Sequence, residues 1–236
     1  MLFRSSMATV LITGTNRGIG LEFVKQFLAR EDTVLATCRD MGSATELRQL
    51  KNDTRKLHIF ELDVSSQKSM EDLTLQLAGH AIDIFINNAG VYGPRDSTFG
   101  KVSANEWAKV LQVNAKAPMI LTQLLIDNLR DGSDKKLLYI TSKMGSINDN
   151  KGGGSYVYRS SKAALNAVVK SISVDLRDSG FSVAVLHPGW VQTDMGGPNA
   201  LIDVTTSVSK MIDVIDNLNS HNSGSFFNYD GGIIPW

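Results

Sequence analysis

Short apolar runs alternate with amphipathic stretches along almost the whole chain. The runs are rich in leucine and β-branched residues and stop at glycine or polar residues, which is typical of strands buried on both faces of a sheet. We predict seven strands, at Ala8–Thr13, Thr33–Cys38, Leu57–Leu62, Ile82–Ile86, Lys136–Thr141, Ser182–Leu186 and Ser225–Asn228.

The stretches between these strands repeat apolar residues at helical spacing. They predict a helix entered through Gly14, Gly18 and Gly20, and further helices at Ser43–Lys51, Gln67–Leu77, Ser103–Val113, Ala117–Arg130, Ser155 to about Ser179, and Thr205–Leu218. Strands alternating with helices imply an α/β fold of the Rossmann type, with a doubly wound, mostly parallel seven-stranded sheet and helices on both faces. No linker or repeat interrupts residues 1–236, so we expect a single domain with residues 1–7 as a flexible leader and Met7 as an alternative start.

Composition narrows the functional classes. The 236 residues are 42% apolar with zero formal net charge, which suits a large core and argues against nucleic acid as a partner. Cys38 is the only cysteine, which favours a reducing compartment, and the four histidines have no metal-ligand spacing. No apolar run approaches the roughly 20 residues of a membrane span. We therefore expect a cytoplasmic protein without a metal.

Candidate ligand-binding residues follow the ends of six predicted strands. In strand order they are Gly14, Arg39, Asp63, Asn87–Gly90, Ser142 and Pro188-Gly189. Ligands of doubly wound sheets bind at the carboxyl ends of the strands, and polar residues scattered at random would not collect there. The pattern predicts a small-molecule site at this edge.

The glycines after the first strand suggest a dinucleotide. Their spacing, Gly14-x-x-x-Gly18-x-Gly20, differs from the usual Gly-x-Gly-x-x-Gly, so a tight turn and a phosphate cradle are both open interpretations. An NAD site would place a carboxylate near Cys38, whereas Arg39 and Arg17 suit the 2′-phosphate of NADPH. The alternatives are that both arginines are solvated surface charges, or that Asp40 contests the assignment.

Tyr158 and Lys162 are candidates for acid–base chemistry. They are four residues apart on a predicted helix, which places them on one face, and a nearby cation lowers the pKa of a phenol by roughly 1–3 units. Tyr156 has Ser160 at the same spacing and so lacks a cation. A chance pair on an exposed helix face is the alternative.

Two further polar residues fit such a site. The Ser142 hydroxyl follows a strand and suits a substrate carbonyl oxygen, although a turn or cap serine would look the same. Asn114 interrupts a helical run just before Pro118, where it would act as a cap or hold a water that connects Lys162 to solvent.

The motifs together resemble the short-chain dehydrogenase/reductase family. They are Thr13-Gly14-x-x-x-Gly18-Ile19-Gly20, Asn87-Asn88-Ala89-Gly90, Tyr158-x-x-x-Lys162 and Pro188-Gly189-x-Val191-x-Thr193. Three stretches are similar to the C-factor and sniffer-type carbonyl reductases, namely Gly152–Asn166, Leu186–Ala200 and Tyr229–Trp236.

This resemblance implies NADPH-dependent reduction of an aldehyde, ketone or quinone by a tetrad of Asn114, Ser142, Tyr158 and Lys162. Tyr158 would protonate the carbonyl oxygen, Ser142 would orient it, Lys162 would bind the nicotinamide ribose, and Asn114 would hold a relay water. The NADP(H) contacts implied are Gly14, Asn16, Arg17, Gly18, Ile19, Gly20, Cys38, Arg39, Asp63, Val64, Asn88, Ala89, Gly90, Tyr158, Lys162, Pro188, Gly189, Val191 and Thr193. A C-factor-type signalling protein with little turnover and an NAD-dependent alcohol dehydrogenase are the alternatives.

Two features concern the substrate and the assembly. The segment after Thr193 is short where many relatives carry a longer lid, and Gly145, Trp190 and Met195 suggest a partly apolar pocket. The helix that begins at Ser155 is apolar on two sides, with a sheet-covering stripe of Leu165, Val168, Val169, Ile172 and Leu176 and a second stripe of Ala163, Ala167 and Val174. No long insertion before Tyr158 covers this second stripe, which predicts a homodimer or a tetramer of such dimers, helped by the Ser103–Arg130 helices.

Overall fold

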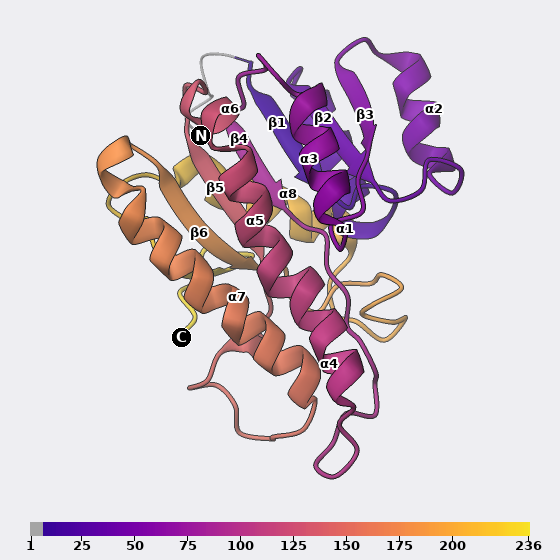
Figure 1. Ribbon diagram of the computed structural model, residues 1–236, viewed down its shortest axis with the longest axis vertical. Helices are drawn as coiled ribbons and strands as arrows, with labels where there is room; N and C mark the ends of the chain where they lie inside the picture. Colours follow the sequence, from indigo (N-terminus) through magenta and orange to yellow (C-terminus); the bar gives the residue numbers. More distant parts are fainter. Residues whose placement is uncertain (1–6) are drawn as a thin grey trace.

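A single parallel sheet organises the computed structural model, which describes residues 7–236 (Figure 1). The strand order is β3-β2-β1-β4-β5-β6-β7, and all six neighbouring pairs are parallel. The predicted doubly wound, seven-stranded fold is confirmed. The strands are β1 (Thr9–Thr13), β2 (Thr33–Cys38), β3 (Leu57–Glu61), β4 (Ile84–Asn87), β5 (Lys136–Ile140), β6 (Ser182–His187) and β7 (Ser225–Asn228).

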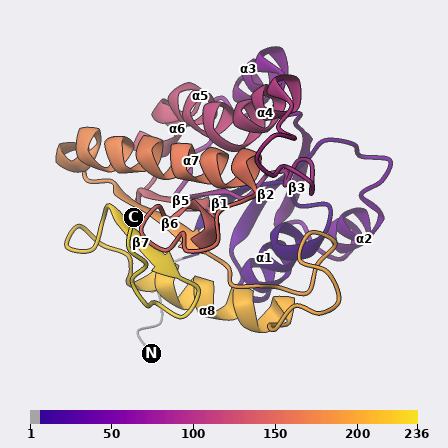
Figure 2. The same cartoon turned by 90° about the horizontal axis from the view of Figure 1, so that it is seen from below.

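Helices cover both faces of this sheet (Figure 2). One face carries α1 (Gly18–Ala29), α2 (Thr45–Asp53) and α8 (Val204–Asn217). The other face carries α3 (Gln67–Gln76), α4 (Ala104–Leu111), α5 (Ala117–Leu124), α6 (Ile126–Arg130) and α7 (Tyr156–Asp175). None of these helices in the described part of the chain is long and apolar enough to cross a membrane.

The two faces bury separate apolar clusters because successive side chains of a strand point to opposite sides. In β1, Val10 and Ile12 pack with α1 and α8, whereas Leu11 packs with the helices of the other face. Both sets are fully buried, which explains why the strands read as continuous apolar runs.

The chain reverses direction across the sheet at β1. It runs outward from β1 to β2 and β3, then returns to form β4 on the other side of β1. The loops that leave β1 and β4 lie side by side at the carboxyl edge, at the switch point where doubly wound sheets bind their ligands in a crevice.

The helical run from 103 to 130 differs from the prediction. Asn114 does not break it: Gln112–Lys116 forms a π-helical turn, closed by a bond from the Ala117 amide to the Gln112 carbonyl, and α5 continues directly. Single π-turns inside α-helices are frequent at functional sites. Short 3₁₀ turns at Lys143–Gly145 and Arg177–Ser179 were also not predicted. The expected leader at 1–7 lies outside the described residues except for Met7, which is exposed.

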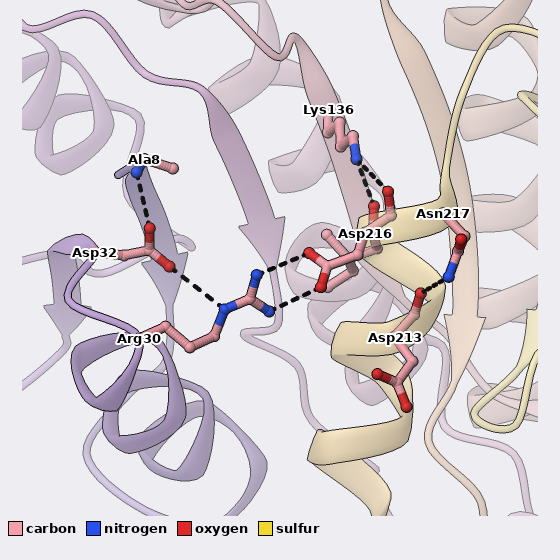
Figure 3. A network of polar contacts seen from close by, with 8 residues as sticks. Ala8, Arg30, Asp32, Lys136, Asp213, Asp216 and Asn217 are labelled. Atoms are coloured by element: carbon pink, nitrogen blue, oxygen red, sulfur yellow. Dashed lines mark hydrogen bonds and ion pairs between the residues drawn. The ribbon is translucent and has the colours of Figure 1, made fainter. Parts of the chain in front are cut away.

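A polar network fastens the opposite, amino edge of the sheet (Figure 3). The Asp32 carboxylate accepts a 2.7 Å bond from the amide of Ala8, just before β1, and lies 3.8 Å from the Arg30 guanidinium. Arg30 also makes two 3.0 Å bonds to Asp216, and Lys136 Nζ donates to the Asp216 carbonyl at 2.9 Å. These contacts tie α1 and α8 to the starts of β1 and β5, far from the crevice.

Candidate active site

The glycine loop packs so closely that its residue types are dictated by space. Gly14 follows β1 with φ +70° and Gly18 begins α1 with φ +56°, and residues with a side chain rarely adopt such positive φ angles. A Cβ at Gly20 would lie 2.1 Å from the Gly14 carbonyl oxygen. The loop therefore folds back against the first turn of α1 and leaves the amino end of that helix open to a ligand.

Residues after β4 hold this loop in place. Asn88 Nδ2 donates to the carbonyls of Thr13 and Gly14 at 2.9 and 3.0 Å. The Thr13 hydroxyl in turn accepts the amides of Asn88 and Ala89, both at 3.0 Å. The predicted motifs after β1 and β4 are thus bonded to each other across the crevice.

The end of β2 presents one cation toward solvent. Arg39 is exposed and forms no ion pair with any residue that the structure describes, while the neighbouring Cys38 thiol is buried, 3.4 Å from Met41 Sδ. Burial raises the pKa of that thiol, so Cys38 offers a cofactor only its backbone. The Asp40 carboxylate accepts the Gly42 amide at 2.8 Å and is occupied in its own turn.

Other predicted contacts lie along the same edge. Asp63 is half-buried, and its carboxylate accepts the Ser65 amide and hydroxyl at 2.9 and 2.7 Å. Asn16 and Val64 are half-buried beside their strands, and Ile19 packs against the apolar cluster under α1.

The segment after β6 closes the crevice from the other side. Gly189 has φ +86°, and Val191 pairs with Ile202, which turns the chain back after Pro188. A Cβ at Gly18 would lie 3.4 Å from the Thr193 methyl, so this segment meets the glycine loop. Arg17 reaches the same segment through a 2.9 Å ion pair with Asp194, in which both side chains are largely exposed.

Tyr158, Ser142 and Lys162 come together beside this crevice. Tyr158 is only 7% exposed and shares a hydrogen bond with the Ser142 side chain. Lys162 Nζ lies 5.9 Å from the Tyr158 ring centroid and donates to the Ile140 carbonyl at 2.9 Å. Tyr156, by contrast, is 41% exposed and lies beside Phe99.

The pKa of Tyr158 moves in the opposite direction to the expectation. Burial raises it to about 12, and the hydrogen bond from Ser142 only partly opposes that effect. Burial also lowers the pKa of Lys162 to about 8. The expected lowering by the neighbouring cation fails because desolvation dominates and the ammonium points to the Ile140 carbonyl. Tyr158 is therefore a firmly protonated phenol at neutral pH.

Ser142 is a cap as one interpretation expected, whereas Asn114 caps no helix and binds the backbone of Val91 instead. The Asn114 carboxamide accepts the Val91 amide at 2.9 Å and donates to the Val91 carbonyl at 2.7 Å and to the Ser161 hydroxyl at 3.0 Å. Ser142 caps the 3₁₀ turn by accepting the Met144 amide at 3.1 Å while it also contacts Tyr158. Asn114 thus braces the loop after β4, and Ser142 is both a cap and a neighbour of the phenol.

Tyr92 is a site residue that the sequence did not reveal. Its ring stacks on that of Tyr158 with centroids 4.4 Å apart and an angle of 22° between the planes. It lies in a loop without periodicity, and its only signal is that it follows Gly90 by two residues. Position alone could not distinguish it from an ordinary loop tyrosine.

Comparison with known proteins decides the family. Residues 8–201 match the model of the short chain dehydrogenase family. The chain belongs to this family. The C-signal protein of Myxococcus xanthus is 47% identical over 155 residues, which cover 66% of this chain and 93% of that protein.

Two solved short-chain dehydrogenase structures resemble this one closely. The carbonyl reductase Sniffer of D. melanogaster superposes with a TM-score of 0.93 at 34% identity, covering 98% of this chain and 100% of that one. An NADPH-bound carbonyl reductase from chicken fatty liver gives 0.91 at 34% identity and covers 98% and 99%. The resemblance to sniffer-type reductases and to C-factor is confirmed.

Two hollows of this short-chain dehydrogenase lie away from the tetrad. One, of about 440 Å³, is lined by α4, the π-turn, α5 and α7, mostly with apolar residues but also with Gln112 and Lys116. Another, of about 280 Å³, lies between α8 and β7. Among residues 7–236, no three His, Cys, Asp or Glu side chains converge as metal ligands would.

Proposed function

We propose that this short-chain dehydrogenase reduces a carbonyl compound, an aldehyde, ketone or quinone, to the alcohol with NADPH. The observation that carries the proposal is the buried phenol of Tyr158. It is protonated at neutral pH, hydrogen-bonded to Ser142 and one helical turn from Lys162. A general acid needs this state, because it must hold a proton until the substrate oxygen accepts it.

The residues around the crevice fit a dinucleotide phosphate. The packing of Gly20 against Gly14 leaves room only for backbone at the start of α1, where helix amides attract phosphate. The exposed Arg39 supplies positive charge for a 2′-phosphate, and Arg17, which pairs with Asp194 at 2.9 Å, adds a second guanidinium at the same edge, while the Asp40 carboxylate bonds the Gly42 amide in its own turn. The NADPH of the similar chicken carbonyl reductase supports the same choice. When bound, the reduced nicotinamide supplies a hydride to the carbonyl carbon.

The chain's own residues supply the remaining chemistry. Tyr158 donates its phenolic proton to the carbonyl oxygen, and the Ser142 hydroxyl orients that oxygen. Lys162 binds the nicotinamide ribose, and its ammonium stabilises the phenolate left after proton transfer. Asn114 holds the relay water, besides bracing Val91 with its carboxamide. The other proposed cofactor contacts are the residues predicted along the carboxyl edge, from Asn16 to Thr193.

Paired tyrosine variants test the proposal. Tyr158→Phe removes the proton donor and should reduce kcat/KM by about 10²–10⁴ while NADPH binding is retained. Tyr156→Phe is the matched control, since this exposed ring lies on the same helix without a cation partner. Oxidation of NADPH with a panel of aldehydes, ketones and quinones gives the activity. Loss of activity in the Tyr156 variant alone would contradict the assignment.

A signalling role with little turnover is the second candidate, favoured by the similarity to C-signal. It predicts that the protein binds NADPH but consumes it with none of the carbonyl compounds in the panel. The same assay, combined with a binding titration, therefore separates the two functions.

We also propose that the protein forms a homodimer, or a tetramer of such dimers, through α4, α5 and α7. Val174 is 51% exposed and Ala167 is exposed along one side of α7, whereas Leu165, Val169 and Ile172 are buried against the sheet. The apolar hollow of about 440 Å³ continues this face between α7 and the Ala108–Ile120 region. A second copy of the same helices would bury both.

A further inference from the structure

Tyr92 lies on the phenol that is proposed as the general acid. The two rings are stacked at 4.4 Å, and the Arg95 guanidinium lies over the Tyr92 ring at 5.6 Å from its centroid. Because the Tyr158 ring and the Arg95 guanidinium already pack on the Tyr92 ring, we interpret Tyr92 as a residue that supports Tyr158 and not as a substrate contact. Such aromatic pairs prefer defined offsets and so restrict the orientation of both rings.

The backbone on both sides of Tyr92 is held firmly. The Asn114 carboxamide binds both the amide and the carbonyl of Val91, the residue before it. Gly93, the residue after it, has φ +78°, and a Cβ there would lie 2.6 Å from a Val110 methyl. Tyr92 is therefore fixed between a side-chain clamp and a close contact with α4.

Two further contacts connect Tyr92 to the surroundings of the site. Its hydroxyl lies 3.4 Å from the Ser155 hydroxyl, at the residue that precedes α7 and has φ +45°. Arg95 donates to the Met195 carbonyl at 3.3 Å, which joins the loop after β4 to the segment after Thr193. The Tyr92 loop thus touches both the start of the helix that carries Tyr158 and the segment that closes the crevice.

We infer that Tyr92 is a positioning residue, whose ring holds the Tyr158 ring in the orientation for proton donation and keeps water away from it. The inference rests on the proposed function of Tyr158 as the acid. It also gives Asn114 a defined action, because the clamp on Val91 fixes the backbone from which Tyr92 projects.

The protonation of the Tyr158 phenol depends on the side chains packed around it. The titratable side chains that face the phenol are Lys162 from α7 and Tyr92 from the loop, with Arg95 behind Tyr92. Burial and the proximity of Tyr92 both raise the pKa of Tyr158. The acid works only while it is protonated, and removing the Tyr92 ring admits water and lowers the pKa of Tyr158.

Ring removal and ring retention at position 92 test the inference. Tyr92→Ala should reduce kcat roughly three- to tenfold, the change that corresponds to about 0.5–1.5 kcal/mol for an aromatic pair, and Tyr92→Phe should restore most of it. In the alanine variant the pKa of Tyr158 itself should fall by roughly half a unit or more. Tyr156→Ala is the matched control and should change neither quantity.

A second readout does not depend on turnover. Titration of the cofactor-free protein at the phenolate absorption band should show one tyrosine ionising at lower pH in Tyr92→Ala than in the wild type, and not in Tyr156→Ala. NADPH binding and thermal unfolding verify the fold, and Tyr92→Leu replaces the alanine variant if that one does not fold.

Two results would overturn the inference. One is an alanine variant whose kcat and phenolate titration both match the wild type. The other is a variant that raises only KM for the carbonyl substrate, which would make Tyr92 a substrate contact. A wild type without reductase activity would instead refute the proposed function, while the phenolate titration would still report on the stack.

Discussion

Replacing Lys162 with methionine should make the protein more stable and inactive. The ammonium of Lys162 is buried and donates a hydrogen bond to the Ile140 carbonyl at 2.9 Å. It also lies 5.9 Å from the centroid of the Tyr158 ring. The charge of Lys162 therefore contributes little to the stability of the fold, as expected for a residue whose role is chemical.

The magnitude follows from the pKa of Lys162. Burial lowers it from 10.5 to about 8, and each unit corresponds to about 1.4 kcal/mol, so the charged form destabilises the fold at neutral pH by about 3 kcal/mol. Methionine has a similar shape and removes this penalty, but it leaves the Ile140 carbonyl without its donor, which costs about 1–3 kcal/mol. We expect Lys162→Met to raise the free energy of unfolding by about 1 kcal/mol at pH 7.

The pH dependence of the difference is the sharper signature. Between pH 8 and 10.5 the unfolded wild type keeps the lysine proton that the folded protein has lost, so wild-type stability gains from this group as pH rises. The methionine variant lacks this gain. Its advantage should disappear and then reverse above about pH 9 to 10, where only the missing hydrogen bond remains.

Urea denaturation of the cofactor-free proteins at several pH values measures this. Lys170→Met is the matched control: Lys170 lies on the same helix and donates to the Gly224 carbonyl at 3.1 Å, but it is exposed. It should lose up to about 1 kcal/mol, with no crossover. A Lys162→Met protein destabilised at pH 7 by more than about 1 kcal/mol, or one whose difference from wild type ignores pH, would refute the reasoning.

Three further substitutions test the cofactor site, the assembly and the glycine loop. Arg39→Ala should reduce kcat/KM with NADPH by about 10- to 150-fold and leave NADH nearly unaffected, and equal losses with both cofactors, or a wild-type preference for NADH, would refute the assignment of Arg39 to the 2′-phosphate. Val174→Glu should dissociate the proposed dimer in light scattering at micromolar concentration, and a monomeric wild type would refute that assembly. Gly20→Ala should cost about 1–3 kcal/mol or more in thermal unfolding and weaken NADPH binding, because its Cβ meets the loop carbonyl. Gly152→Ala, which meets no atom within 4 Å, is its control and should be neutral.

The sheet was predictable because most of its strands are buried on both faces. A short run rich in apolar and β-branched residues, such as Thr33–Cys38, admits few other structures, and β2 has the predicted bounds. The clustering of the polar residues that follow the strands was also predictable, because parallel strands bring their carboxyl ends to one edge of the sheet. The π-turn at Asn114 was not, because a helix with one extra residue in a turn keeps nearly the same apolar pattern.

The direction of the Tyr158 pKa shift could not be predicted from the sequence. The spacing of Tyr158 and Lys162 places them on one face, but whether the cation or burial controls the phenol depends on what covers it. The cover is Tyr92, from a loop 66 residues earlier in the chain, and only the tertiary structure brings the two rings together. The expected pKa direction was wrong for that reason.

Burial at this site has opposite consequences for the two neighbours. It disfavours the charged form of each group, so it holds Tyr158 as the neutral acid and makes the charged Lys162 a burden to the fold. The two effects become useful together once the phenol gives up its proton, because the phenolate then has a cation within reach in a dry environment, where the attraction is strong. The same cover that delays ionisation of the free phenol would thus favour the pair of charges formed during the reaction. The buried charge of Lys162 thus lowers the stability of the cofactor-free protein. In return, Tyr158 keeps its proton until a substrate oxygen accepts it.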